Sequence, residues 1–593
     1  MKMTAALLKE YVQAGGAKIP SDKVIKNGQL VNVMTSEVYP ADVAIYKGKI
    51  VGVGDVASYI GEKTEIIDAN GKYLVPGLID GHIHVECSKM SMTSFSKAVV
   101  PYGTTSAVSG LDEYISVVGM DGLQEIFKEI EELPLRLYWG APYKTPYTIP
   151  KSTIAFNITP EVQKEVQSWP QCFGVWETVR EAVQTLDEDT METLSIAHNN
   201  HLPIFGCAPM ARGINLNEYL SAGIRLDHES YDHDELVEKA RKGMHVLIRE
   251  SSVTNFLNEN IRAVTEVNSA IGRRTSFCTD DVHATDILSK GHVDHLVRLA
   301  IGAGVTPMVA IQMATINSAE AYRIDDQVGS ISPGRFADIL FVESLEEFKV
   351  DTVISKGDIV AKNNQMVVDL PEPKRSPLLA SKLKCERTTK ETFEYKVGID
   401  KGTAKIRAIE SHGAFVRKEK FVELDVEDGK VVLDVEKDVA MVSVLERFGK
   451  NGNQSLGFVA GWGLKRGAMA SSSAPDDNNL IVMGTNSEDM SLAINTLIDC
   501  GGGQVIVVDG EVISLLKLPI GGIVTDEDPE TLVAKEKELH EAINVLGGSV
   551  PDPMFYMSFL PITAIPDLAI TDVGNVDCVT LEIFDPITEL IPE

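Results

Sequence analysis

The sequence contains few cysteines and no long apolar run. Seven cysteines occur among 593 residues, and none of them forms a C-x-x-C pair. A disulfide framework is therefore not expected, and reduced thiols are the default. No apolar run reaches the roughly 18 residues that a membrane-spanning helix requires, and the N-terminal run at residues 5–8 is too short for a secretory signal. We therefore expect a cytoplasmic protein without a membrane partner.

Basic residues are also scarce relative to acidic ones. The chain has 55 Lys and Arg against 86 Asp and Glu, which gives a formal net charge of −31. A field of this sign repels phosphate backbones, so we expect no nucleic-acid partner and a small neutral or cationic substrate. The apolar share of 44% and the charged share of 24% are those of an ordinary globular protein. At this length, about two or three domains are expected.

The pattern of strands and turns divides the chain into three parts. Residues 1–74 contain short β-rich runs with hairpin turns, and similar runs return at residues 326–370. A small β domain built from both segments requires residues 75–325 to be an inserted domain. A Pro- and Lys-rich stretch at residues 371–387 is typical of a linker, and residues 388–593 are expected to form a third, mixed α/β domain.

The inserted segment has the pattern of repeated βα units. About eight apolar, strand-like runs are separated by stretches of helical length, which predicts a (β/α)8 barrel and an α/β fold class. Helices are expected at residues 121–132, 235–241 and 292–301, and the third domain should contain a helix at 488–499 and a hairpin at 504–513. The expected barrel strands end near His84, Gly110, Ala141, Glu177, Ala208, His228, Glu250 and Asp280.

His82 and His84 are the first candidate ligands for a metal ion. Residues at i and i+2 of a strand point to the same face, so the two imidazoles should lie together with Ile83 turned away. Further ligand-type residues close later strands, and in a barrel all of these strand ends meet at one mouth. Such a set suits one or two divalent cations with a bound water. The additional candidates are Glu177, Cys207, His228 and Asp280.

Each additional candidate also has an ordinary structural interpretation. Glu177 could occupy the first turn of a helix, where the dipole favours a carboxylate, and Asp280 could cap a helix. Cys207 could be a small buried apolar residue, and His228 could be a solvated loop residue. Their common position at strand ends is what favours the metal site.

Several motifs resemble the bacterial adenine deaminase family of the amidohydrolase superfamily. The resemblance covers nearly the whole chain, and it implies metal-dependent hydrolysis of adenine to hypoxanthine and ammonia, with manganese, iron or zinc as the metal. In the barrel the matching segments are residues 76–86, 103–105, 222–225, 227–229, 279–281 and 313–315. In the third domain they are residues 457–459, 463–465, 484–486, 488–490, 518–520 and 557–560.

The resemblance also implies roles for individual residues. Asp280 would contact metal and water, take the proton of that water, and return it to the leaving amine. Glu86 and Glu113 are candidates for protonating a ring nitrogen of the substrate. The implied metal ligands are His82 and His84 for one ion, Glu177 as a bridge, and His228 for a second ion.

The sequence departs from the family motifs at several histidines. Cys207 stands where the family has the histidine of Gly-His-Ala-Pro, so a thiol would replace an imidazole ligand. The family's Asp-Pro-His-Glu is Gly-Leu-Asp-Glu at residues 110–113, and its Ala-His-Asp-Ser-His-Asn is Ala-Pro-Asp-Asp-Asn-Asn at residues 474–479. A thiolate binds zinc or iron but suits manganese less well than imidazole does.

Two other functions remain open at the level of sequence. The barrel and its metal could act on another purine-like compound or on a cyclic amidine or amide, and the lost histidines favour this alternative. A paralogue that binds a ligand without turnover is the third hypothesis, and the presence of the water-activating residues argues against it. A zinc deaminase of the cytidine type is excluded because the chain has no P-C-x-x-C motif. A homo-oligomer is also possible.

Overall fold

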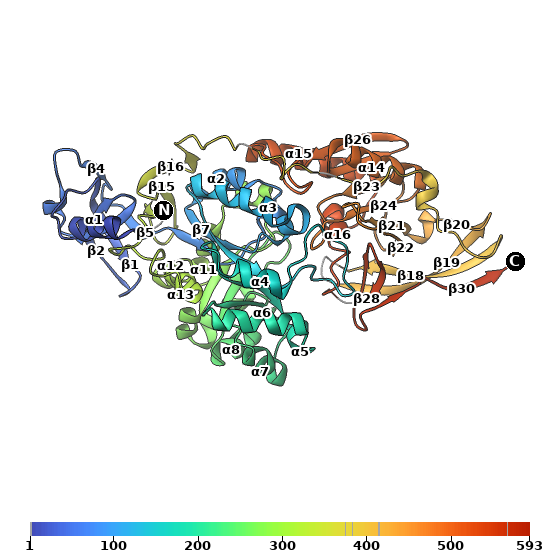
Figure 1. Ribbon diagram of the computed structural model, residues 1–593, viewed down its shortest axis with the longest axis horizontal. Coiled ribbons are helices and arrows are strands. Elements are labelled where there is room, and N and C mark those ends of the chain that lie inside the picture. The colour runs from blue at the N-terminus through green and yellow to red at the C-terminus, as the bar shows by residue number, and fades with distance from the viewer. Residues whose placement is uncertain (1–2, 374, 382, 413–415, 566) are drawn as a thin grey trace.

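The computed structural model describes residues 3–373, 375–381, 383–412, 416–565 and 567–593. Figure 1 shows a small β domain, a central barrel and a third domain that follow one another along the longest axis of the molecule. The small domain contains both blue N-terminal strands and the yellow-green strands β15 and β16, which come much later in the chain. In the described part of the chain, every helix is too short or too polar to cross a bilayer.

The small β domain is one sheet assembled from two distant segments. Strands β5 and β14 pair antiparallel, with Tyr73 opposite Val342 and Pro76 opposite Ile339. The chain therefore leaves this sheet at β5, forms the barrel, and returns at β14. The strands of the first segment are β1 (Lys23–Asn32), β2 (Glu37–Tyr46), β3 (Lys49–Gly54), β4 (Glu65–Asp68) and β5 (Tyr73–Pro76), preceded by helix α1 (Ala5–Gly15). Those of the second are β14 (Ile339–Val342), β15 (Val350–Ser355), β16 (Asp358–Lys362) and β17 (Gln365–Met366).

The predicted barrel of eight parallel strands is confirmed. Each strand pairs in parallel with its neighbour in chain order, from β6 through to β13. Apolar side chains such as Val108, Phe205 and Leu247 fill the interior between the strands. The strands are β6 (Leu78–Asp80), β7 (Thr104–Ser109), β8 (Arg136–Pro142), β9 (Cys172–Val179), β10 (Ile204–Cys207), β11 (Leu226–Asp227), β12 (His245–Arg249) and β13 (Thr275–Cys278).

The seam between the first and last strands closes the barrel just beyond their regular parts. Strand β6 is shorter than predicted and ends at Asp80, so His82 and His84 lie in the extended segment that follows it. In this segment Ile83 forms a parallel bridge with Asp280. The backbone N–H of Asp280 donates to the carbonyl of His82 at 2.9 Å, and that of His84 donates to the carbonyl of Asp280 at 3.3 Å. This pairing keeps both imidazoles on one side, as the i, i+2 spacing predicts.

Helices surround the barrel and place acidic residues at its mouth. Helix α3 begins at Asp112, earlier than predicted, because it continues through a kink at Gly119, whose φ of 70° suits glycine. Its first turn therefore brings Asp112 and Glu113 to the end of β7. The barrel helices are α2 (Met92–Val99), α3 (Asp112–Glu132), α4 (Pro160–Val166), α5 (Arg180–Gln184), α6 (Glu188–Asn199), α7 (Gly213–Ser221), α8 (His233–Arg241), α9 (Leu257–Asn260), α10 (Ala284–Lys290), α11 (Val293–Gly302), α12 (Pro307–Met313) and α13 (Ile316–Tyr322).

The third domain is a large sheet with helices on both faces. Helix α14 packs Met490 and Leu497 on one face, and Ile543 and Met557 from α15 and α16 pack on the other. The expected helix and hairpin of this domain correspond to α14 and to β25 with β26. The large sheet contains β18 (Gly402–Ser411), β19 (Arg417–Glu427), β20 (Lys430–Val431), β21 (Val439–Leu445), β22 (Gln454–Ala460), β23 (Ala468–Ser471), β24 (Leu480–Gly484), β25 (Gly503–Val508), β26 (Glu511–Lys517) and β30 (Ile587–Pro592). The α-helices of this domain are α14 (Ser487–Cys500), α15 (Pro529–Ile543) and α16 (Pro553–Ser558), and a small sheet contains β27 (Leu568–Thr571), β28 (Gly574–Asp577) and β29 (Glu582–Phe584).

The third domain packs directly on the barrel. Helix α15 contacts α2 and α10, and Figure 1 shows it lying across the top of the barrel. In the segment that joins the two domains, Arg375 forms ion pairs with Glu129 of α3 and with Asp526. The two domains therefore share a charged contact beside the barrel mouth.

Candidate metal centre

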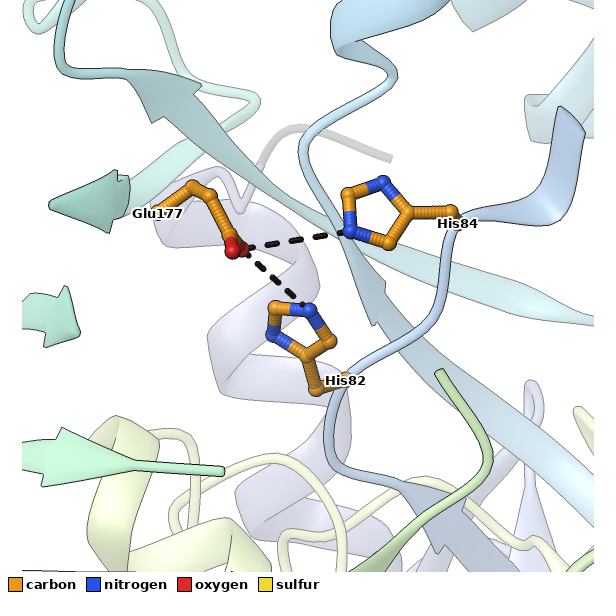
Figure 2. A group of neighbouring side chains, drawn as sticks. All are labelled: His82, His84 and Glu177. Atoms are coloured by element: carbon orange, nitrogen blue, oxygen red, sulfur yellow. Dashed lines mark ion pairs between the residues drawn. The ribbon is translucent and has the colours of Figure 1, made fainter. Parts of the chain in front are cut away.

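The candidate ligands from different strands converge at the barrel mouth. Figure 2 shows the imidazoles of His82 and His84 pointing toward the Glu177 carboxylate. The Nε2 atoms of His82 and His84 lie 3.3 and 3.9 Å from Glu177 Oε2, and 3.5 and 3.6 Å from Asp280 Oδ1. Among the described residues, three overlapping groups have ligand atoms within 4.8 Å of one another: His82, His84 and Glu177; His82, His228 and Asp280; Glu177, Cys207 and His228. The structure thus brings together all six residues that the sequence singled out as ligands.

The backbone is unusual at two of these positions. Glu177 and Asp280 both have φ near 55°, in the left-handed region that L-residues rarely adopt. Such a conformation costs about 1–3 kcal/mol per residue, and it persists where the surrounding structure imposes it. At each position the turn directs the carboxylate across the mouth toward His82. The strain therefore coincides with the proposed site.

Hydrogen bonds and ring contacts fix the orientation of two imidazoles. His228 Nδ1 lies 3.1 Å from the carbonyl oxygen of Gly206. A carbonyl can only accept, so Nδ1 carries the proton and the lone pair of Nε2 faces the centre. The ring of His82 is stacked between His228 at 3.6 Å and Trp176 at 4.0 Å. Both rings are held with a nitrogen directed toward Glu177.

Burial and neighbouring charges shift the pKa values of the cluster in both directions. Burial would lower the pKa of His84, but the charges of Asp112, Glu177 and Asp280 override it and hold that pKa well above its ordinary value. Burial lowers the pKa of His82 and of His228, so both imidazoles are neutral and can act as ligands. Burial raises the pKa of Glu177 and, together with the charge of Glu177, that of the Cys207 thiol. In the described part of the chain, both ring nitrogens of His82 and the Oε2 atom of Glu177 are buried without a hydrogen-bond partner. Buried polar atoms left in this way fit a metal ion that would satisfy them.

Arg249, at the end of β12, holds the catalytic candidate Asp280 and was not anticipated from the sequence. One guanidinium nitrogen lies 2.6 Å from Asp280 Oδ2 and also pairs with Glu229, and the other lies 2.8 Å from Asp281 Oδ2. Burial would raise the pKa of Asp280, but Arg249 overrides it and holds that pKa well below its ordinary value. One oxygen of Asp280 is thereby neutralised while the other faces the imidazoles. The sequence signal that could have identified Arg249 is its position as a charged residue at the end of the apolar run of β12.

A second layer of carboxyl groups lies beside the ligands. Burial and the charge of Asp112 raise the pKa of Glu86 to about 7, and burial with the charge of Glu86 raises that of Glu113. In the described structure, Oε2 of each glutamate is buried without a hydrogen-bond partner. Asp112 Oδ1 lies 3.5 Å from His84 Nδ1, opposite the nitrogen that faces Glu177. The glutamates can therefore carry protons, and Asp112 orients His84.

The third domain contributes to the same mouth. Burial, together with the charge of Asp112, raises the pKa of Asp476 to about 7, so the carboxyl groups of the third domain and the barrel interact electrostatically. The loop after β8 is held by the third domain, since Asn479 Nδ2 donates to the carbonyl of Thr153 at 2.9 Å and Lys450 Nζ donates to that of Ala155 at 2.9 Å. The site is therefore shared between two domains.

A buried lysine connects two of the ligand-bearing strand ends. Lys239 of α8 is fully buried, and its Nζ lies 2.7 Å from Asp227 Oδ2 and 2.6 Å from Glu235 Oε1. It also donates to the carbonyl oxygens of Ala208 and Glu229, both at 2.9 Å. These acceptors flank Cys207 and His228, so Lys239 positions both candidate ligands.

Replacing Lys239 with Met should destabilise the barrel. The substitution leaves the carboxylates of Asp227 and Glu235 buried without a counter-charge, which costs about 3–5 kcal/mol of unfolding free energy. The measurement is urea denaturation followed by tryptophan fluorescence. Lys242→Met is the matched control, because Lys242 pairs with Glu238 near the surface, where such a pair contributes about 1 kcal/mol or less. Equal midpoints for the two variants would contradict the expectation.

Comparison with known proteins agrees with this geometry. Residues 73–360 match the family model described as "Amidohydrolase family", and residues 414–582 match that of the "Adenine deaminase C-terminal domain". "Adenine deaminase 1" of Desulfotalea psychrophila is 63% identical over 592 residues, covering 100% of both chains. "Adenine deaminase 1" of Latilactobacillus sakei is 64% identical over 98% of both chains, and "Adenine deaminase 4" of Rhizobium meliloti is 50% identical over 98% of this chain and 97% of its own. The chain belongs to the adenine deaminase family of the amidohydrolase superfamily.

Proposed function

We propose that this protein is a metal-dependent hydrolase that converts adenine and water to hypoxanthine and ammonia. The observation that carries the proposal is the convergence of three imidazoles and two carboxylates on one point of the barrel mouth, with Asp280 held ionised by Arg249. Full-length identity to relatives named adenine deaminase supports the choice of substrate. A protein that only binds a ligand has no need of this set of groups.

The proposed roles follow from the position of each side chain. His82, His84, Glu177, Cys207 and His228 would hold one or two divalent cations. A bound divalent cation lowers the pKa of water toward neutrality and so supplies a nucleophile for C6 of adenine. Asp280 takes the proton of the attacking water and returns it to the departing ammonia.

Glu113 and Glu86 are proposed to deliver a proton to the purine ring. Because the pKa of Glu86 is raised to about 7 and that of Glu113 is also raised, either carboxyl can hold a proton near neutral pH, and the Oε2 atom of each has no hydrogen-bond partner in the described structure. A proton on that nitrogen withdraws electrons from the carbon under attack and lowers the barrier to addition. Each glutamate can accept the proton back when the tautomer of the product forms.

The identity of the metal depends on Cys207. A sulfur ligand favours zinc or iron over manganese, whereas imidazole and carboxylate ligands accept all three. We therefore propose zinc or iron at the position nearest Cys207, next to His228. Manganese at the His82 and His84 position is compatible with the nitrogen and oxygen donors there.

Cys207→His should shift this preference toward manganese. The ratio of the dissociation constants for manganese and zinc should change by about tenfold or more, which corresponds to about 1.4 kcal/mol. The measurement is competition between the two ions for the metal-free protein, with bound metal determined by mass spectrometry. Cys172→Ser, a substitution at a cysteine buried outside the cluster, is the control. An unchanged ratio and unchanged metal content would show that Cys207 is a packing residue.

A second candidate is a related amino-heterocycle in place of adenine. Asp112 occupies a position where the family motif carries a histidine, and Asp476 follows another such position. These carboxyl groups change the pattern of hydrogen-bond donors and acceptors offered to the substrate. An added exocyclic amine on the base would find acceptors there. This observation favours an aminopurine with a further donor group.

Ammonia release by metal-loaded protein separates the candidates. The purified protein is stripped with a chelator, reloaded with manganese, iron or zinc, and assayed with adenine, other aminopurines and cyclic amides. We expect adenine turnover that disappears on chelation and returns with metal. Turnover of another compound while adenine is inert would overturn the adenine proposal, and loss of all turnover in every loaded form would overturn the enzymatic one.

A further inference from the structure

A cavity of about 520 Å³ lies between the barrel and the third domain. Its barrel side is formed by the loops that follow β6, β12 and β13, and its other side by α15, α16 and the loop that follows β23. This volume is within the range of pockets that bind small molecules. It is not part of the ligand cluster, because none of the six candidate metal ligands lines it.

The cavity leads from the surface toward the catalytic groups. Among the lining residues, Lys537 and His540 are exposed, whereas Ser473 and Pro475 are buried. Cys87 also lines the cavity, and its Sγ lies 3.1 Å from Asp281 Oδ1 and 3.9 Å from Glu113 Oε1. The cavity therefore reaches within one side chain of the proposed proton donor. His82 and Asp280 have exposed fractions of only 1% and 2%, whereas the side chains of His84 and Glu177 keep 15% and 13%, so the accessible part of the site lies on the side of His84 and Glu177.

The walls suit a flat aromatic molecule. Phe555 packs its ring 4.2 Å from Phe559 and 5.1 Å from the imidazole of His283, and all three rings line the cavity or its edge. Phe555 and Phe559 are largely buried, and the parts of their rings that line the cavity can stack on a planar ligand. His283 lines the cavity, and its Nε2 is buried without a hydrogen-bond partner in the described structure, so a turn of the ring is needed to offer this nitrogen to a ligand.

The charge in the cavity suits a neutral molecule. The Lys89 ammonium is paired with Glu536 Oε1 at 2.9 Å, so this buried cation is already neutralised. An anionic ligand would have to compete with Glu536 and with the acidic groups beyond Cys87. A cation would lose part of its hydration against the apolar walls of Phe555 and Val253, which costs free energy.

We propose that this cavity is the access chamber of the enzyme, in which a neutral planar heteroaromatic base stacks on Phe555 and bonds to His283 before it passes Cys87 into the catalytic site. The inference deepens the proposed function and rests on it, since it names the route by which the purine reaches the metal centre. It also gives the third domain a direct role, because that domain supplies Phe555.

Chemical modification of Cys87 tests the chamber without turnover. Metal-stripped full-length protein is treated with N-ethylmaleimide, and the rate of labelling at each cysteine is followed by mass spectrometry with and without adenine. We expect adenine to slow labelling of Cys87 by about fivefold or more at saturation. Cys500, a half-buried cysteine in the third domain outside the cavity, is the internal control and should be labelled at the same rate in both samples.

Two variants test whether adenine protects Cys87 from labelling by binding in the chamber. In Phe555→Ala the adenine concentration needed for protection should rise about fivefold to tenfold, as expected for the loss of one stacked ring. In the metal-loaded enzyme the same variant should raise KM by a similar factor and leave kcat nearly unchanged. Phe584→Ala, which removes a ring from the third domain outside the cavity, is the matched control. His283→Ala provides a second variant if Phe555→Ala is unfolded by circular dichroism.

The outcomes separate the chamber from the reaction. If the loaded enzyme deaminates adenine but adenine never protects Cys87, or protects it equally in Phe555→Ala and His283→Ala, the chamber is overturned. If adenine protects Cys87 in a manner that depends on Phe555 but is not deaminated, the proposed reaction fails and the chamber stands. If adenine neither protects nor reacts, both are wrong.

Discussion

Asp280→Asn should lower kcat for adenine deamination by about 10³-fold while the protein stays folded. Asn has the same shape as Asp and tolerates the left-handed backbone at this position, where φ is 55°. It cannot take a proton from water, and general acid–base groups contribute about 10²–10⁴-fold to rates. The amide oxygen can still face His82 and His84, so part of the metal should be retained.

The measurement compares kcat, metal content and melting temperature of the variant with those of Asp326→Asn. Asp326 is an exposed residue outside the site, and its replacement should leave all three quantities unchanged. Metal retained with activity lost would assign proton transfer to Asp280. Near-normal kcat in Asp280→Asn would remove this residue from the mechanism, and complete loss of metal would make it primarily a ligand.

Arg249→Met should reduce both activity and stability. Arg249 forms ion pairs with Asp280 and Asp281 at 2.6 and 2.8 Å, and removal of a buried partner typically costs about 3–5 kcal/mol. With its restraint lost, Asp280 is displaced from the attacking water, and a displacement of about 1 Å can lower kcat about 10²-fold. Arg249→Lys restores the charge but not the paired geometry, so it should recover stability better than activity.

The pH profile separates a positioning role from a purely structural one. In the wild type Arg249 holds the pKa of Asp280 low, so Asp280 stays ionised as the pH falls. Without Arg249 this pKa rises, so Asp280 becomes protonated at a higher pH. The acid limb of the kcat/KM profile should therefore shift to higher pH. A lower kcat/KM at every pH, with no shift of the acid limb along the pH axis, would contradict this role. Arg262→Met, which removes an exposed arginine, is the control.

The fold and much of the candidate site followed from the sequence because a parallel barrel restricts where side chains can meet. Eight strand-like runs with helical spacers admit few other architectures. Once the strands were identified, the residues at their carboxyl ends, such as Glu177 and His228, had to face one another. Convergence was thus predictable without any knowledge of distances.

Arg249 and Asp112 were missed for different reasons. Arg249 closes an apolar strand, and the sequence pattern alone does not show that its charge is buried among three carboxylates. Asp112 was noted only as a departure from a motif. Its contact with His84 depends on α3 starting at residue 112 after a left-handed Leu111, with φ of 47°. Such a turn reflects tertiary packing and leaves no sequence signal for a leucine.

The contribution of the third domain could not have been predicted from pattern. Asp476 and Phe555 lie hundreds of residues from the barrel loops that they approach, and no local periodicity encodes a contact of that range. Sequence could identify the domain and its separate core, but not which of its surfaces faces the barrel. Docking of two folded domains depends on the shapes of both.

The seam of the barrel links folding to metal loading. His82 and His84 come from the first strand's extension and Asp280 from that of the last, and they are joined by the bridge between Ile83 and Asp280. A cation bound by these residues would cross-link the first and last strands of the barrel. A ligand at 100 times its dissociation constant stabilises the folded state by about 2.7 kcal/mol. Loss of the proposed metal would therefore remove this cross-link and lower the free energy of unfolding of the barrel.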